Sequence, residues 1–249
     1  MSENEQFIRF DSLHKAFGDH EVLRGVDLAV RRGETVVVLG GSGSGKSVLL
    51  RHAIGLHRPD SGQVWVDGQE ITTFGEERLI ETRKKVGMLF QAGALFDSMS
   101  VEENVSYALH QHTDWSAEKI EHRVREVLQL VELGQVEELM PADLSGGMRK
   151  RVALARAIAL APRGILYDEP TTGLDPITAN TINHLIRSLQ KRLGVTSIVV
   201  THDIHSAFTV GDRIAFLRDG TILFDGSVEE ARRSEEPLLR NFLEGGGYG

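Results

Sequence analysis

The sequence has no cysteine, no excess of positive charge and no long apolar run, and each absence excludes a class of protein. Without cysteine among its 249 residues, the chain can form neither a disulfide nor a cysteine-ligated zinc site, which is compatible with a reducing compartment. Its 36 acidic and 28 basic residues give a net charge of −8, whereas nucleic-acid binding requires a basic face. We therefore expect no nucleic-acid partner.

The absence of long apolar runs bears on membranes. No run approaches the ~20 residues that cross a bilayer, and the polar, acidic start of the chain does not resemble a signal peptide. A chain of this length can bury the core of one large α/β domain or of two small ones. If the protein works at a membrane, we expect a partner to hold it there.

A glycine-rich stretch is the strongest motif in the chain, because it fits the phosphate-binding pattern G-x-x-x-x-G-K-[ST] at every fixed position. Its residues are Gly40, Gly41, Ser42, Gly43, Ser44, Gly45, Lys46 and Ser47. Glycines let successive backbone N–H groups turn around the phosphates of a nucleotide, where a Cβ would obstruct them. Lys46 reaches the β- and γ-phosphates, and Ser47 offers its hydroxyl to Mg²⁺. The motif predicts a nucleotide site.

The flanking elements favour this site over the alternative, a flexible surface loop. Residues 36–39 are an apolar run typical of a buried strand, and the apolar residues between 48 and 54 are spaced as in a helix. Strand, loop and helix occur in the order that the motif requires, and a helix N-terminus attracts phosphate. Upstream, residues 7–30 predict a strand, a turn and a second strand. In this region Phe17 either stacks on a nucleotide base or packs in the core.

Polar residues at the ends of predicted buried strands are the next candidates, because open α/β sheets place ligands there. Of Asp168 and Glu169, one can hold Mg²⁺ through water while the other polarises an attacking water. Gln91 either contacts a metal or a water, or is a solvated loop residue. Of the ten histidines only His202 follows such a strand. The other histidines are mostly expected to be exposed, and none has the neighbours of a metal ligand.

Between residue 92 and about residue 160 the strand patterns disappear. Apolar residues recur there on one face of a helix that begins near Ser116, so the span is predicted to be a helical subdomain inserted between strands. Near its end, Ser145 is a predicted N-cap, and Gly146 and Gly147 leave free N–H groups at a positive helix end. This is either a second anion site or only a capped helix. The three basic residues that follow are either a solvated patch or a phosphate-facing one.

Together these motifs resemble an ABC transporter ATPase subunit over essentially the whole chain. The motifs, in the family's order and approximate spacing, are the phosphate loop, Gln91, Leu144 to Met148, Asp168-Glu169, Gly173-Leu174-Asp175 and His202. The resemblance implies an α/β P-loop ABC ATPase fold, with a mostly parallel core sheet, an antiparallel β subdomain and an inserted helical subdomain. It also implies a single ABC ATPase domain over residues 1–249. Its expected parts are a core (1–91 and 161–249), the helical subdomain with the signature motif (92–160) and a C-terminal tail (237–249).

The resemblance also implies roles in nucleotide and metal binding, with ATP and Mg²⁺ as the ligands. Phe17 would stack on adenine. Ser47, Gln91 and Asp168 would lie at Mg²⁺, with Gln91 also sensing the γ-phosphate.

For hydrolysis, the resemblance makes Glu169 the general base and His202 the switch residue on the γ-phosphate. Ser145, Gly146 and Gly147 would complete the nucleotide site of a second copy. Two copies would then enclose two ATP molecules head to tail, so a homodimer is expected in the ATP-bound state.

Further residues resemble the MlaF group, the ATPases of Mce-type transporters that move phospholipids, or in some relatives sterols, between membranes. The residues that carry this resemblance are 90–98, 101–105, 140–149 and 197–200. Met148 agrees with it, since most ABC ATPases have glutamine at that position. The 171–175 segment has the general ABC form instead, and the tail after Phe242 is shorter than in many members.

We therefore predict an ATP-hydrolysing motor subunit that drives lipid transport from the cytoplasmic face of the inner membrane. The expected partners are transmembrane permease subunits, an Mce-domain lipid-binding protein and a small regulatory STAS-domain subunit. The alternative within the same chemistry is an importer of amino acids or another small solute. Soluble ABC ATPases of DNA repair or ribosome function usually carry coiled-coil insertions or two ATPase units, and this chain has one motif set and no heptads. A nucleotide-gated scaffold without turnover is disfavoured by the presence of Glu169 and His202.

Overall fold

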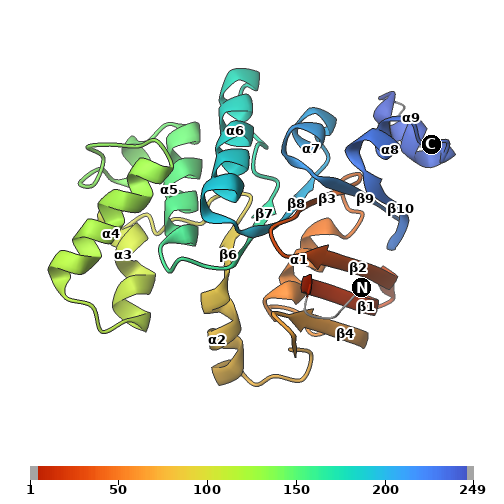
Figure 1. Ribbon diagram of the computed structural model, residues 1–249, viewed down its shortest axis with the longest axis horizontal. Helices are drawn as coiled ribbons and strands as arrows, with labels where there is room; N and C mark the ends of the chain where they lie inside the picture. The colour runs from red at the N-terminus through yellow and green to blue at the C-terminus, as the bar shows by residue number, and fades with distance from the viewer. Residues whose placement is uncertain (1–4, 246–249) are drawn as a thin grey trace.

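Two β-sheets of different type organise the protein (Figure 1). The structure is a computed structural model that describes residues 5–245. Residues 1–4 of the polar start and residues 246–249 of the expected C-terminal tail therefore lie outside the described residues. The larger sheet has the strand order β10-β9-β3-β8-β7-β6, and the smaller sheet has the order β2-β1-β4-β5.

The larger sheet is parallel except for β10, which pairs antiparallel with β9. Its strands are β3 (Thr35–Leu39), β6 (Val86–Leu89), β7 (Gly164–Asp168), β8 (Thr196–Thr201), β9 (Arg213–Arg218) and β10 (Thr221–Ser227). The smaller sheet is antiparallel. Its strands are β1 (Gln6–Phe17), β2 (His20–Arg31), β4 (Ser61–Val66) and β5 (Gln69–Glu70). The strands predicted from apolar runs are confirmed.

Most of the helices lie between strands in the chain, and the last two helices follow the last strand. The helices are α1 (Lys46–Ala53), α2 (Glu76–Lys85), α3 (Val101–His112), α4 (Ala117–Leu130), α5 (Gly146–Ile158), α6 (Pro176–Leu193), α7 (Ile204–Val210), α8 (Val228–Arg232) and α9 (Pro237–Leu243). In Figure 1 the helices α3, α4 and α5 lie together on one side of the molecule, while β1, β2 and β4 lie on the other. Within residues 5–245 no helix combines the length and the apolar character needed to span a membrane.

Side-chain alternation along β3 builds a core on each face of the larger sheet. Val36 and Val38 pack with the smaller sheet and with α1, whereas Val37 and Leu39 pack with the helices of the other face. Successive residues of a strand point to opposite faces, so five consecutive buried residues indicate a sheet that is covered on both sides. The loop that follows Leu39 is thereby held between two cores.

The helical segment between β6 and β7 begins its helices with side-chain caps. Helix α4 begins directly after Ser116, as predicted, and the Ser116 hydroxyl accepts a hydrogen bond from the Lys119 N–H. At the start of α3, Ser100 and Glu103 form a reciprocal capping box, with distances of 3.2 and 2.7 Å. The Ser-x-x-Glu spacing was the available sequence signal for this second helix start.

One histidine differs from the expectation of exposure. His52 is only 1% exposed, because it lies on the same face of α1 as the buried residues Leu49 and Ala53. Its Nδ1 donates to the carbonyl of Val48 at 2.7 Å, which leaves Nε2 buried without a hydrogen-bond partner.

Candidate nucleotide site

A cleft of about 380 Å³ lies where the carboxyl ends of the parallel strands β3, β6, β7 and β8 meet the end of β1. It is lined by Phe17, Val22, Ser42, Gly43, Gly45, Lys46, Ser47, Val48, Gln91, Glu169 and His202. The structure thus brings together residues that are far apart in the chain, as expected at this edge of an open α/β sheet.

The glycines of the loop between β3 and α1 are required by its backbone. Gly43 and Gly45 have φ of 80° and 100°, in the left-handed region that favours glycine. A Cβ on Gly40 would lie 2.3 Å from the carbonyl oxygen of Leu217, which is too close for any side chain. The loop leads directly into α1, whose N-cap Gly45 provides no capping side chain, so N–H groups at the positive helix end remain available to an anion.

Lys46 lines the cleft, and its side chain is 5% exposed. Its ammonium donates to the carbonyls of Gly40 and Gly41 at 2.9 and 2.7 Å and lies 3.6 Å from the Glu169 carboxylate. Burial lowers the pKa of Lys46, and the neighbouring carboxylates of Glu169 and Asp168 offset part of that effect. A phosphate anion would add favourable charge at this position.

Ser47 and Asp168 provide adjacent oxygen ligands. The Ser47 hydroxyl donates to the Asp168 carboxylate at 2.6 Å. Among residues 5–245 no group of three or more histidine or acidic side chains could hold a metal by itself. A serine hydroxyl with one carboxylate fits Mg²⁺, which binds proteins through few oxygen ligands and completes its octahedron with waters and substrate phosphates.

Glu169 leaves the strand geometry at the end of β7. Its φ of 46° is in the left-handed region, and its N–H donates to the carbonyl of Val200 at 2.9 Å. This backbone turn, rather than the alternation of side chains along a strand, separates the direction of the Glu169 side chain from that of Asp168. Non-glycine residues adopt this conformation only when surrounding contacts enforce it, and such residues cluster at functional sites.

Several groups hold the Glu169 carboxylate in place. The hydroxyls of Thr172 and Thr201 donate to Oε2 at 3.2 and 3.3 Å. His202 Nδ1 lies 3.0 Å from the carboxylate, which can only accept, so Nδ1 carries the proton. The His202 side chain is 49% exposed, whereas that of Glu169 is 9% exposed, so His202 is the member of the pair that contacts solvent.

Phe17 is an exposed ring beside this site. Its 46% exposure contradicts the alternative of core packing. The ring of His57 meets it edge-on at a centroid distance of 5.5 Å, and Lys15 Nζ lies 5.4 Å from its centroid. Phe17 lines the same cleft as Lys46, so an aromatic surface is available to a base next to the phosphate loop.

Two basic side chains of helix α5 donate hydrogen bonds to backbone carbonyls of the segment that begins at Gln91. Lys150, 7% exposed, donates to the carbonyl of Gln91, and Arg156 donates to those of Gly93 and Ala94 at 2.9 and 2.8 Å. Of the three basic residues after Gly147, Arg149 is exposed, Lys150 is buried and Arg151 is half-buried. They contact backbone carbonyls: Arg149 that of Leu144, Lys150 that of Gln91, and Arg151 those of Val131 and Glu132.

The predicted second anion site at the start of α5 lies apart from the cleft. Ser145 is the N-cap, as predicted, and its hydroxyl accepts from the Met148 N–H at 3.2 Å. Gly147 faces α6, where an added Cβ would lie 2.6 Å from the Thr178 methyl carbon. Among the described residues, the lining of the cleft includes neither Ser145 nor Gly146 nor Gly147.

Comparison with known proteins agrees with this geometry. The ABC transporter family matches residues 23–172, more than half of the chain. The chain belongs to this family. As an ABC ATP-binding domain it has the α/β fold predicted from its motifs, with a parallel-rich sheet, an antiparallel sheet and helices.

Two curated relatives are similar over nearly the whole domain. The chain is 41% identical to MlaF, the "Intermembrane phospholipid transport system ATP-binding protein" of Escherichia coli K12, over 92% of the chain and 85% of MlaF. It is also 41% identical to the "Probable ribonucleotide transport ATP-binding protein mkl" of Mycobacterium leprae, over 96% of the chain. The chain spans 69% of the length of that mycobacterial relative.

A solved structure with the same fold is the ATP-binding cassette MJ0796. In a dimeric, post-hydrolysis state bound to ADP and Pi it superposes with a TM-score of 0.82 at 34% identity, covering 89% of this chain and 99% of MJ0796.

Proposed function

We propose that this ABC protein binds and hydrolyses ATP in the cleft between the phosphate loop, Asp168, Glu169 and His202. The observation that carries this is the convergence of a phosphate loop, an oxygen pair suited to Mg²⁺ and a constrained glutamate at one sheet edge. Phe17 would stack on the base, and Lys46 would move from the loop carbonyls to the β- and γ-phosphates.

The proposed metal site consists of Ser47 and Asp168, together with Gln91, which lines the same cleft as Ser47. Mg²⁺ would neutralise charge on the β- and γ-phosphate oxygens. The Ser47 hydroxyl, in the first turn of α1, and the Asp168 carboxylate at the end of β7 would hold it.

In the proposed reaction Glu169 positions a water and takes its proton. The water oxygen bonds to the γ-phosphorus while the bond to the bridging β–γ oxygen breaks, giving ADP and inorganic phosphate. His202 donates to the Glu169 carboxylate here and would donate to a γ-phosphate oxygen when substrate is bound. The two threonine hydroxyls on Oε2 keep the carboxylate fixed through the step.

The active state would be a homodimer in which Ser145, Gly146 and Gly147 complete the site of the second copy. Support comes from the position of these residues, outside the cleft of their own chain but at an uncovered helix N-terminus. The similar cassette MJ0796 is dimeric with its nucleotide products bound.

The transported molecule would be a phospholipid. MlaF, with the phospholipid-transport name, aligns over a larger share of its own length than mkl, whose name favours ribonucleotides as the second candidate. Permease subunits would hold the protein at the cytoplasmic face of the inner membrane, with an Mce-domain protein and a STAS-domain subunit in the same assembly. The segment after Gln91, where Phe96 and Tyr107 are 43% and 42% exposed, would contact a permease helix.

Gentle purification of the tagged protein from native membranes, with mass spectrometry of its proteins and lipids, tests this proposal. We expect a permease, an Mce-domain protein and enriched phospholipid. A permease with a solute-binding protein, or with bound nucleotide and no lipid, would replace phospholipid by a small solute. Ribosomal or DNA-bound partners without a permease would remove the transport function.

A further inference from the structure

A hydrogen-bonded network of side chains lies behind the Glu169–His202 pair, on the side away from the cleft. It consists of Thr171, Asn183, Asp203 and Ser206, which come from the turn after β7, from α6, and from the start of α7. Ser206 Oγ is its centre, at 2.9 Å from Asn183 Nδ2, 2.7 Å from Asp203 Oδ2 and 3.3 Å from Thr171 Oγ1.

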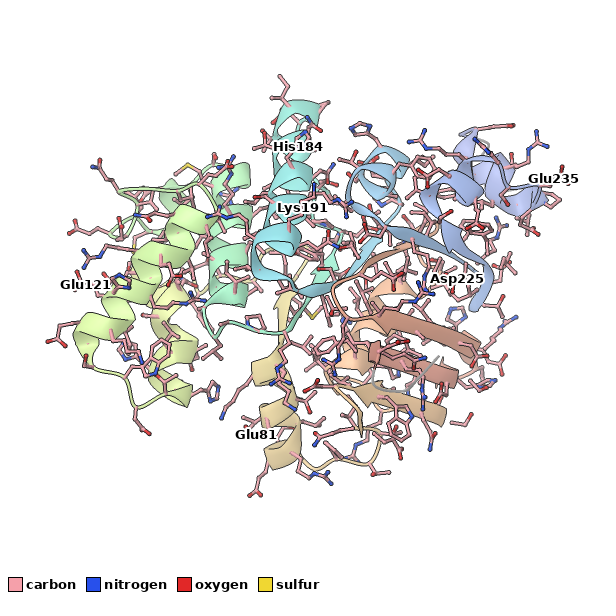
Figure 2. The ribbon with its side chains drawn as sticks, in the orientation of Figure 1. Glu81, Glu121, His184, Lys191, Asp225 and Glu235 are labelled. Atoms are coloured by element: carbon pink, nitrogen blue, oxygen red, sulfur yellow. The ribbon has the colours of Figure 1, made fainter. Side chains whose placement is uncertain are left out.

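The central members of the network are buried polar side chains. Asn183 and Ser206 are both 0% exposed and Thr171 is 6% exposed. Asn183 occupies a position on the inner face of α6 between the buried residues Ile182 and Leu185. The next residue, His184, is exposed on the same helix (Figure 2). Asn183 Nδ2 donates to Ser206 Oγ, whereas its Oδ1 is buried and has no hydrogen-bond partner among the described residues. An amide at this position therefore carries a desolvation cost that an apolar side chain would not.

The direction of each hydrogen bond is fixed by the chemistry of the groups. The Asp203 carboxylate can only accept, so the single Ser206 proton goes to it. Ser206 Oγ then accepts from the Asn183 amide and from the Thr171 hydroxyl. All hydrogen-bonding capacity of the Ser206 side chain is used in one arrangement, which holds the three segments in a single relative position.

The network leads directly to the proposed catalytic pair. The Asp203 N–H donates to Thr201 Oγ1 at 3.0 Å, and Thr201 Oγ1 lies 3.3 Å from Glu169 Oε2. His202 is the residue between these two anchored neighbours. At the other end, Thr171 follows Glu169 by two residues, and its own neighbour Thr172 donates to the same Glu169 carboxylate.

We propose that Ser206 is a positioning residue for ATP hydrolysis, held by Asn183 and Thr171 and acting through Asp203 on His202 and Glu169. The inference rests on the proposed hydrolytic function of that pair. Ser206 does not line the cleft, so it sets the geometry of the reaction without contributing to nucleotide affinity.

Steady-state ATP hydrolysis and nucleotide affinity of the full chain test this role. We expect Ser206→Ala to lower kcat roughly 10- to 100-fold, because small misplacements of reacting groups cost that much. Affinity for a fluorescent ATP analogue should stay within about twofold, since no phosphate or base contact is removed. His184→Ala, on the exposed side of α6, is the matched control and should retain wild-type turnover.

A second pair of variants keeps the test independent of folding defects. Thr171→Val removes the hydroxyl at nearly constant shape and should reproduce the loss in kcat, while Thr171→Ser keeps the hydroxyl and should restore most of it. In a His202→Ala background, Ser206→Ala should lower kcat little further, because both changes act on one unit.

The outcomes separate this inference from the proposed function. Unchanged turnover in both His202→Ala and Glu169→Gln would overturn the hydrolytic roles themselves. Slow turnover in those two variants, with wild-type kcat in Ser206→Ala and Thr171→Val, would overturn the network alone. A Ser206→Ala effect that simply multiplies with that of His202→Ala would also overturn it, by placing Ser206 outside the pathway to His202.

Discussion

At the scale of single residues, the Glu169 carboxylate is the most constrained group of the site. Exchanging it for the amide in Glu169→Gln keeps the shape but removes the proton acceptor. We expect turnover to fall by roughly 10²- to 10⁴-fold while ATP binding is preserved. Phosphate release and equilibrium binding of a fluorescent ATP analogue measure the two quantities. Near-normal phosphate release would exclude Glu169 as the base.

Lys46 is expected to act on binding rather than on the proton transfer. Lys46→Ala removes the cation that faces the loop, and hydrogen bonds to charged groups contribute about 1.5–3 kcal/mol, so ATP affinity should fall at least about tenfold. Lys191, exposed on α6 (Figure 2), provides the control Lys191→Ala, which should bind ATP as the wild type does. Equal affinity of the two variants in titration calorimetry would contradict the phosphate-loop assignment.

The buried His52 predicts a loss of stability in mild acid. Burial lowers the pKa of His52 to about 4, assisted by the nearby positive charge of Lys15. The unfolded chain therefore binds a proton near pH 6.5 that the folded protein does not accept. The protonation of His52 alone should lower the free energy of unfolding by about 2 kcal/mol as the pH falls from 7.5 to 5.

Urea unfolding at the two pH values measures this effect. His52→Leu should lose less stability between pH 7.5 and pH 5 than the wild type, while His184→Leu at an exposed position should lose as much as the wild type. Equal pH dependence in all three proteins would show that His52 is protonated without cost in the folded state.

At the scale of secondary-structure elements, the cap of α3 supports the segment between Gln91 and the helical part. The Ser100 hydroxyl accepts from the Glu103 N–H, so Ser100→Ala should cost about 1 kcal/mol of unfolding free energy. Ser98→Ala, at an exposed position in the same loop, is the control. Urea denaturation of the two variants gives the difference, and an equal midpoint would mean that the cap does not stabilise the folded state.

The secondary-structure elements show which parts of the fold can be predicted from local sequence patterns. Apolar runs predict the parallel strands and therefore the edge where Asp168 and His202 lie, because buried strands need only their own side chains to be recognised. The left-handed turn at Glu169 and the bond from Lys150 to Gln91 could not be predicted. Both depend on contacts between segments distant in the chain, on which local periodicity carries no information.

The same limit applies to Asn183 on α6. The apolar neighbours of Asn183, at helical spacing, predict the buried face of the helix. A polar asparagine does not fit that apolar pattern, so the pattern does not predict that Asn183 is buried. Only the meeting of α6 with α7 shows that Asn183 has a buried partner in Ser206. Likewise, His52 follows the helical period of α1, and its residue type alone suggested exposure.

At the scale of the whole molecule, the cleft and the proposed contact to the nucleotide of a second copy lie apart on one chain. The cleft holds the phosphate loop and Glu169, whereas Ser145 is exposed at the start of α5. If two copies pair head to tail, ATP should act as the contact between them, and slow hydrolysis should preserve the pair. We therefore expect Glu169→Gln to sediment as a dimer with ATP and Mg²⁺ and as a monomer with ADP.

Adding Ser145→Arg to Glu169→Gln should keep the protein monomeric with ATP, because the longer cation occupies the space that the nucleotide of the second copy needs. Ser145 is exposed, so the single chain accommodates the change and its own cleft should still bind ATP. Ser98→Arg in the same background is the matched control and should still dimerise. If the Ser145→Arg protein sediments as an ATP-dependent dimer, the start of α5 does not face the nucleotide, and the two copies must associate through another surface.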